Sequence, residues 1–166
     1  MNINKFTQNS LQAVQSCEKV AYDYGNQEIA QEHLLYALVT QDDSLILKLL
    51  EKMNVQGTLF INRVEEAINK RPKVQGGQVF VGQDLNNVLI HAEDEAKQMR
   101  DEYVSVEHLF LALLKHASRE MKALFREFGI NRNSFLQALS SVRGNQKVTS
   151  DNPEATYDAL AKYGTD

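Results

Sequence analysis

Small and apolar residues recur along most of the chain at the three- and four-residue spacing of amphipathic helices. This spacing predicts a helix from about Thr7 to Tyr24, and the same pattern returns from about Gln83 to Met99. Thr7 and Gly82 stand at equivalent N-cap positions before these helices. The pattern predicts an all-α fold.

The two helices belong to a repeat with a period of 75 residues. Residues 18–64 align with residues 93–139 without a gap and with nine identical pairs, where average residue usage predicts roughly three. The identical pairs include Glu32 with Glu107 and His33 with His108, and many other pairs exchange one apolar side chain for another. The sequence therefore predicts two copies of one fold in a pseudo-twofold arrangement.

Each copy is predicted to hold four helices. The second begins near Ala30 or Ser105, and the Ser105 hydroxyl is a candidate acceptor for a backbone N–H of the first turn. The third runs from Ser44 to Asn54 or from Ser118 to Gly129, and the fourth covers about 57–70 or 131–143. We therefore divide the chain into repeat one (about 1–70), a crossover loop (about 71–81), repeat two (82–144) and a flexible linker (145–166).

Two short segments outside the helices have patterns of their own. Val79, Phe80 and Val81 form a β-prone stretch in the crossover loop, which predicts a short extended segment. The final residues YDALAKYGTD resume a short amphipathic pattern after the polar linker, and we expect a further module to follow them.

The composition is that of an ordinary globular domain and limits the classes of partner. Apolar residues make up 43% of the chain and charged residues 24%. The net charge of −4, without a basic stripe, disfavours nucleic acid, and no apolar run is long enough for a membrane span. The first residues lack a secretory signal, so we expect a cytoplasmic protein.

The motifs of catalysis and cofactor binding are missing from the sequence. None of the eight glycines precedes a lysine, which excludes the P-loop that cradles nucleotide phosphates. The histidines do not form a recognisable zinc pattern, and Cys17 has the spacing of a core residue. We therefore expect neither a cofactor nor an active site, and place the function in a binding surface where the two copies meet.

The second-helix starts of the two copies identify a family. Residues 29–35 read IAQEHLL and residues 104–110 read VSVEHLF, and this repeat resembles the Clp N-terminal repeat of AAA+ unfoldases over residues 1 to about 144. The segment VRGNQKVTSDNPEATYDALAKYGTD is similar to the linker by which ClpB disaggregases enter their first ATPase module.

The resemblance implies a domain that binds unfolded or aggregated polypeptides. Such domains belong to homohexameric ATPases that use ATP and magnesium in other modules, thread polypeptides through a central pore and work with the DnaK chaperone system. The isolated domain is expected to be monomeric and to bind its clients weakly, because tight capture would obstruct threading.

The resemblance also implies positions for substrate contact. They are Thr7, Asp101 and Glu107, beside an apolar groove that includes Leu89 and His108, with Glu32 and His33 as a possible counterpart in repeat one. We expect Asp101 and Glu107 to form an acidic patch that favours segments flanked by lysine or arginine. Structural roles are equally open, because Thr7 suits a helix cap and both glutamates suit the positive end of a helix dipole.

Two other functions stay open from the sequence. The first is a ClpC-like N-domain, in which Glu32 and Glu107 would receive adaptor proteins or arginine-marked substrates. The second is an independent enzyme with an unrecognised site. The KYGTD ending disfavours the ClpC-like alternative.

Overall fold

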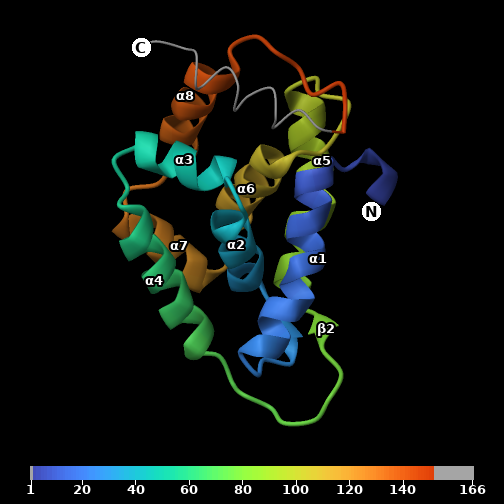
Figure 1. Ribbon diagram of the computed structural model, residues 1–166, viewed down its shortest axis with the longest axis vertical. Helices are drawn as coiled ribbons and strands as arrows, with labels where there is room; N and C mark the ends of the chain where they lie inside the picture. The colour runs from blue at the N-terminus through green and yellow to red at the C-terminus, as the bar shows by residue number, and fades with distance from the viewer. Residues whose placement is uncertain (1, 152–166) are drawn as a thin grey trace.

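The computed structural model describes residues 2–151 and gives each repeat four helices (Figure 1). Repeat one holds α1 (Gln8–Asp23), α2 (Gln31–Thr40), α3 (Leu45–Lys52) and α4 (Gly57–Asn69). Repeat two holds α5 (Gln83–Gln98), α6 (Val106–Lys115), α7 (Arg119–Glu127) and α8 (Arg132–Arg143). The all-α fold with two four-helix repeats is confirmed, and the observed helices begin and end within two residues of the predicted bounds.

Side-chain caps fix several of these helix starts. Thr7 Oγ1 accepts a hydrogen bond from the Ser10 amide at 3.2 Å, and Ser44 and Ser118 cap α3 and α7 in the same way. The start of α6 differs from the prediction, because Ser105 Oγ lies 3.0 Å from His108 Nδ1 and makes no cap hydrogen bond to the backbone. The His108 ring accepts from the Ser105 amide instead, at 2.8 Å.

The third helices of the two repeats differ only in where they begin. Ser44 and Ser118 cap α3 and α7 but lie 74 residues apart, because α7 has nine residues where α3 has eight. Both helices end at aligned residues, Lys52 and Glu127, and the fully buried Leu49 and Leu124 keep the 75-residue spacing. The alignment therefore holds without a gap, and α7 is longer by one residue at its start.

Two short strand pairings connect the repeats. The strand β1 (Glu28–Ile29) pairs in parallel with β2 (Phe80–Val81), which lies within the predicted extended segment. An isolated parallel bridge joins Phe6 to Val104, and these are the 75-residue equivalents of Val81 and Ile29. In each case the segment before the first helix of one repeat pairs with the segment before the second helix of the other, so the pairings reproduce the pseudo-twofold relation.

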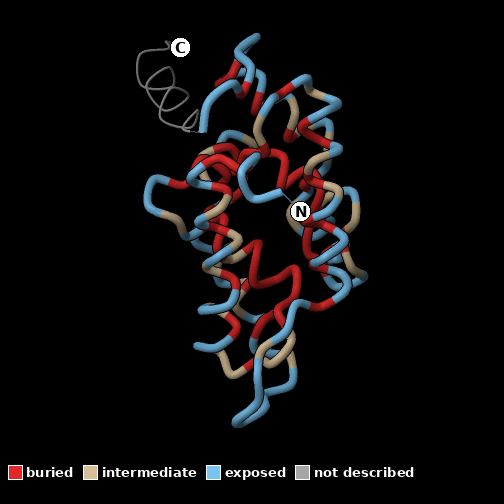
Figure 2. Tube along the Cα trace, turned by 90° about the vertical axis from the view of Figure 1, so that its right-hand side faces the viewer, coloured by how far each residue is buried: buried red, intermediate tan, exposed pale blue. Residues whose placement is uncertain are grey.

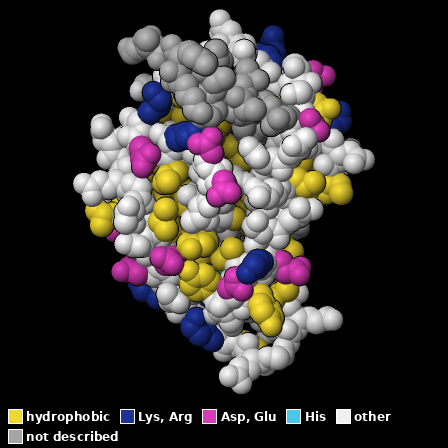
Figure 3. All heavy atoms as spheres, in the orientation of Figure 1, with side chains coloured by type: hydrophobic (Ala, Val, Ile, Leu, Met, Phe, Trp, Pro, Cys, Tyr) yellow, Lys and Arg dark blue, Asp and Glu magenta, His cyan; other side chains and the backbone are white. Residues whose placement is uncertain are grey.

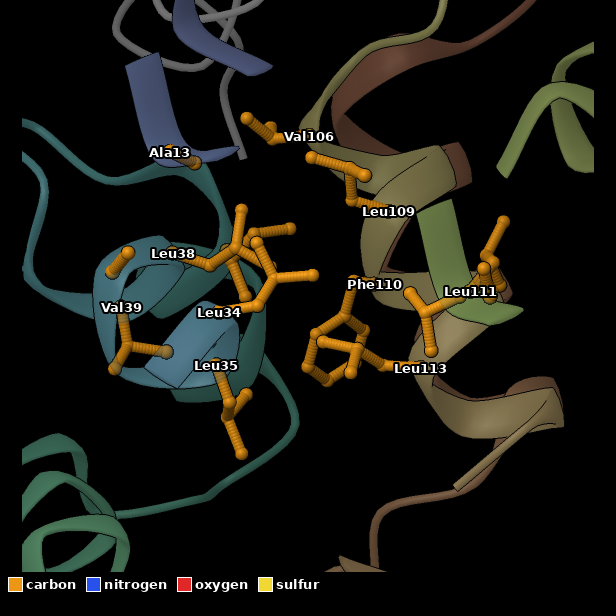
Figure 4. Packing of buried hydrophobic residues seen from close by; sticks show 14 of the residues in the cluster. Ala13, Leu34, Leu35, Leu38, Val39, Val106, Leu109, Phe110, Leu111 and Leu113 are labelled. Carbon is orange, nitrogen blue, oxygen red and sulfur yellow. The ribbon is translucent and has the colours of Figure 1, made fainter. Parts of the chain in front are cut away.

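The core lies between the two second helices, α2 and α6. Leu34 and Leu38 on α2 point toward Val106, Leu109 and Phe110 on α6 in Figure 4, and all of them are buried. Figure 2 shows the buried residues along the middle of the molecule, while the crossover loop at the bottom is exposed. Both helices are apolar on most of their surface, as expected for central helices.

The segment after α8 stays against the domain. Val148 is fully buried, its amide donates to Asp101 Oδ1 at 3.0 Å, and its carbonyl accepts from the Glu102 amide at 2.8 Å. The Asp151 carbonyl accepts from the Gln8 amide at 2.7 Å. The first part of the expected flexible linker is thus held to the domain, whereas the predicted YDALAKYGTD element lies outside the described residues.

Candidate functional site

The structure places the substrate-contact residues that were expected from the sequence inside the protein. Thr7, Glu107 and His108 have no exposed surface, and Leu89 and Asp101 are 6% and 9% exposed. The Asp101 and Glu107 side chains are both fully buried. These residues therefore do not form the acidic surface patch that the sequence suggested, because both carboxylates point to a partner inside the domain.

That partner is Arg143, at the end of α8. Its guanidinium donates to Glu107 Oε2 at 3.2 Å and to Asp101 Oδ1 through Nη2. Asp101 Oδ2 lies 2.7 Å from His108 Nε2. Because the Ser105 amide donates to His108 Nδ1, the proton of the neutral ring lies on Nε2 and is donated to Asp101. We call Asp101, Glu107, His108 and Arg143 the buried charge network.

The buried charge network sets the protonation state of its aspartate. Burial alone would raise the pKa of Asp101, but hydrogen bonds from His108, the Val148 amide and Arg143 outweigh burial and lower the pKa below its usual value. Asp101 is therefore ionised at neutral pH. The Asp101 carboxylate joins three parts of the fold, because it contacts His108 on α6, Arg143 on α8 and the backbone amide of Val148.

Repeat one contains a less charged version of the same arrangement. His33 Nδ1 accepts from the Ala30 amide at 2.8 Å, and its Nε2 lies 2.9 Å from the Asn26 side-chain oxygen. Asn26 is the 75-residue equivalent of Asp101. Burial, followed by the nearby positive charge of Arg71, lowers the pKa of His33 to about 4. The histidine cap explains why Ala30 can begin α2 without a hydroxyl group.

The glutamates that begin α2 and α6 are both paired with arginines of the same chain. Arg71 donates to Glu32 at 3.1 Å and to Glu28 at 2.9 Å, while Glu107 accepts from Arg143. In the ClpC-like alternative these glutamates would receive adaptor proteins or arginine marks. An incoming guanidinium would have to displace the domain's own arginine, so the observed geometry does not favour that alternative.

Thr7 and Leu89 have separate roles in the fold. Thr7 caps α1, and its amide donates to the Val104 carbonyl at 2.9 Å, just before α6. Thr7 is thus brought near the start of the helix that carries Glu107 and His108. Leu89 lies on the buried face of α5 with Leu85, Val88 and Ala92, so its contribution is mainly to the core.

An apolar surface that the sequence reasoning missed lies between α1 and α4, over α2. The rings of Tyr24 and Tyr36 meet edge to face at 5.9 Å, and the Tyr24 hydroxyl donates to Glu65 at 2.7 Å. Val20 and Ile61 precede Tyr24 and Glu65 by one helical turn and are also partly exposed. Figure 3 shows apolar side chains gathered in this part of the molecule.

We call Val20, Tyr24, Tyr36 and Ile61 the front apolar face. Burial, followed by the hydrogen bond to Glu65, raises the pKa of Tyr24, so its hydroxyl stays protonated and oriented toward α4. The sequence signal for this face was the tyrosine at position 36, because its equivalent in repeat two is Leu111, a fully buried core residue. A hydroxyl at a core-like position indicates partial exposure.

Other kinds of site find little support in residues 2–151. No cluster of three or more His, Cys, Asp or Glu in this range could hold a metal ion. Cys17 is buried, and burial raises the pKa of its thiol to about 12, which disfavours the reactive thiolate. No helix in the same range has the length and apolar character needed to cross a bilayer.

Comparisons with known proteins agree with the architecture. Residues 5–128 match the family described as the Clp repeat N-terminal domain. The chain is 46% identical, over 172 aligned positions and its whole length, to the chaperone protein ClpB of Nitratidesulfovibrio vulgaris, and it covers 20% of that protein. The chain thus spans about a fifth of the length of the curated relatives that it matches.

Solved structures show the same fold. The Hsp104 N-terminal domain from Candida albicans has a TM-score of 0.77 at 23% identity, with 89% of this chain and 97% of that chain covered. A ClpV N-domain in complex with a VipB peptide has a TM-score of 0.65 at 20% identity, with 83% and 86% covered. With its two repeats and a family match over most of its length, the chain belongs to the Clp repeat N-terminal domain family, and its whole length is similar to part of the ClpB chaperones.

Proposed function

We propose that this chain is the domain by which a ClpB-type chaperone recognises unfolded or aggregated polypeptides. The front apolar face is the observation that carries the proposal. It presents half-buried tyrosine and aliphatic side chains from three helices, held in place by the Tyr24–Tyr36 and Tyr24–Glu65 contacts. Aromatic side chains that combine an apolar body with a polar end are favoured at binding surfaces.

The physical nature of this face suits an exposed apolar stretch of an unfolded client. Its side chains can gain stability by further burial, and they are rigidly placed before a client arrives. The complex between a ClpV N-domain and a VipB peptide supports peptide recognition by analogy, because that protein has the same fold. In our proposal Thr7, Asp101, Glu107 and His108 do not touch the client. They position the helices of the domain, since they hold α1, α6 and α8 together.

Binding at the front apolar face should be weak. Contiguous apolar patches on monomers rarely exceed about 300–600 Å², which at roughly 25 cal/mol per Å² corresponds nominally to about 8–15 kcal/mol. Association costs about 4–15 kcal/mol, and an unfolded client must also become ordered locally. We therefore expect dissociation constants of about tens of micromolar to millimolar. Weak binding allows the client to be passed on.

The remaining four fifths of the relatives' length would supply the other activities. We propose that a cytoplasmic parent protein contains AAA+ modules that bind ATP and magnesium, assembles as a homohexamer, threads clients through its pore and cooperates with the DnaK system. The present domain would contribute client contact without nucleotide chemistry. The docked residues 145–151 would then set the orientation in which the domain enters its linker.

A titration with a permanently unfolded protein tests the binding proposal. The backbone amide shifts of the wild type are expected to change around Val20, Tyr24 and Ile61 on addition of the client. The variant Tyr36→Gln should weaken binding severalfold, because it removes an aromatic contact. The matched control is Tyr22→Gln, since Tyr22 is 76% exposed on another side of α1 and should bind like the wild type.

Leu89→Gln completes the series, because it tests the groove that the family resemblance implied. Melting temperatures must show that each variant remains folded. Equal client affinity in the wild type and in a folded Tyr36→Gln variant would contradict the proposed face. If Leu89→Gln were the only variant to lose client affinity, the client site would lie at α5 and not at the front apolar face.

A further inference from the structure

A second surface, in repeat two, combines an apolar floor with a positively charged rim. It is a pocket of about 710 Å³ where the end of α6, the helix α7 and the start of α8 converge. This volume lies within the range of about 300–1,000 Å³ that is typical of ligand pockets. Leu114, Phe125 and Ile130 line its floor, and Lys115, Lys122 and Arg126 line its rim.

The floor of the pocket is fixed by the core. Phe125 packs edge to face on the buried ring of Phe110, with the ring centroids 5.8 Å apart. The Ile130 amide donates to the Phe125 carbonyl at 2.9 Å, and both residues are buried while Leu114 is partly exposed. An apolar side chain that enters the pocket would therefore meet a preformed surface and would not need to order it.

The rim has an excess of positive charge. Within residues 2–151, Lys115, Lys122 and Arg126 form no ion pair, and all three are exposed. The nearby Arg132 donates twice to Glu95, at 2.7 and 3.1 Å, and thereby neutralises this buried acid. The pocket is thus locally basic although the chain as a whole has a net charge of −4.

Repeat one does not reproduce this pocket. The 75-residue equivalents of Lys115, Arg126 and Arg132 are Thr40, Glu51 and Gly57. A Cβ atom placed on Gly57 would lie 2.9 Å from Glu51 Oε2 and 3.1 Å from Leu47 Cδ1, so side chains of α3 cover the start of α4. The basic pocket is therefore a property of repeat two and does not follow from the shared fold.

We propose that the basic pocket binds a segment of another polypeptide in which an aromatic or aliphatic side chain is flanked by aspartates or glutamates. The apolar side chain would fill the floor, and the acidic side chains would approach the three unpaired cations of the rim. This interaction differs from client contact at the front apolar face and reverses the charge preference expected for Asp101 and Glu107. It does not depend on whether the front apolar face binds clients.

Three peptides with the same central phenylalanine and leucine would test the charge requirement. They are flanked on both sides by glutamates, serines or lysines, and binding is followed by amide shifts. The acidic peptide should bind about tenfold more tightly than the serine peptide at low salt, with shifts in α6, α7 and the start of α8. This preference should disappear at about 1 M salt, where the Debye length falls to about 3 Å.

Charge-reversed variants locate the interaction. Lys122→Glu combined with Arg126→Glu should lower the affinity for the acidic peptide about tenfold, because it removes two attractive charges from the rim and adds two repulsive ones. The matched control is Lys5→Glu combined with Lys52→Glu, which changes the net charge equally at exposed sites outside the pocket. Both variants must melt like the wild type.

The outcomes separate cleanly. Selective loss of acidic-peptide binding in the pocket variant, with unchanged binding in the control, would support the inference. Equal affinity of the wild type for the serine and acidic peptides, equal loss in both variants, or shifts confined to α1 and α4 would overturn it. None of these results depends on the unfolded-client titration, so the two proposals can fail separately.

Discussion

Replacing Arg143 with methionine should destabilise the domain far more than an ordinary loss of a surface ion pair. Arg143 is 3% exposed and is the cation of the buried charge network, with contacts to Asp101 and Glu107. Methionine keeps much of the side chain's length and removes its charge. Glu107 Oε1 already has no hydrogen-bond partner among the described residues, so the substitution would leave two buried carboxylates without a compensating cation.

The expected cost is about 3–5 kcal/mol, the range for breaking a buried ion pair from one side. Arg71→Met in repeat one provides the matched control. Arg71 is more exposed, with 22% of its side chain accessible, and its partner Glu28 is 43% exposed, so water can hydrate that charge. Its second partner, Glu32, is 4% exposed, so the control leaves one buried carboxylate without its cation, where Arg143→Met leaves two. This control should therefore cost only about 1–2 kcal/mol.

The sequence of repeat one suggests a rescue. Asn26 occupies the position of Asp101 and satisfies His33 without a negative charge. Adding Asp101→Asn to Arg143→Met removes one of the two uncompensated charges. The double variant should therefore regain about 1–2 kcal/mol of the free energy of unfolding, because the effects of substitutions at neighbouring residues are coupled. The Asp101→Asn substitution alone should be destabilising, because Asp101 is ionised in the folded protein.

Urea unfolding at neutral pH measures these differences. With a slope of about 2 kcal/mol per molar urea, Arg143→Met should lower the midpoint by about 2 M while the slope stays unchanged. A cost below about 1 kcal/mol, or a cost equal to that of Arg71→Met, would refute the reasoning. The same conclusion would follow if Asp101→Asn made the Arg143→Met variant less stable.

Three further predictions concern pH, cysteine chemistry and nucleotide. The pKa of His33 is lowered from 6.5 to about 4 in the folded protein, so on acidification the unfolded chain takes up a proton at His33 before the folded protein does. The stability that neutral His33 contributes is therefore complete above pH 6.5 and is lost as the pH falls toward 4. The free energy of unfolding, measured in urea, should fall by about 2 kcal/mol by about pH 5, and the variant His33→Gln should lack this part of the pH dependence. Cys17, buried and with its pKa raised to about 12, should resist iodoacetamide at about pH 8 in the native domain and react after unfolding in urea, as mass spectrometry would reveal; rapid native labelling would contradict its burial. Calorimetric titration with ATP and magnesium should give no binding heat because the sequence has no phosphate cradle, and micromolar affinity would overturn that conclusion.

The sequence by itself determined most of the helical architecture. The 75-residue repeat, the periodic apolar positions and local caps such as Thr7, Ser44 and Ser118 are short-range signals, because a helix is defined by contacts within one or two turns. The same reasoning located Phe80 and Val81 as an extended segment, although not their pairing with Glu28 and Ile29. Strand pairing joins distant segments and leaves no equivalent local pattern.

Only the tertiary structure decided which polar residues face solvent. Asp101 and Glu107 looked like surface acids, yet Arg143 lies 36 residues or more further along the chain and neutralises both inside the domain. In the basic pocket, the ends of α6, α7 and α8 bring together Lys115, Lys122 and Arg126, which a single helix pattern does not connect. Whether a charge is buried, and whether charged residues from several helices meet around one pocket, both depend on the distances between helices. Those distances are set by the packing of the whole core.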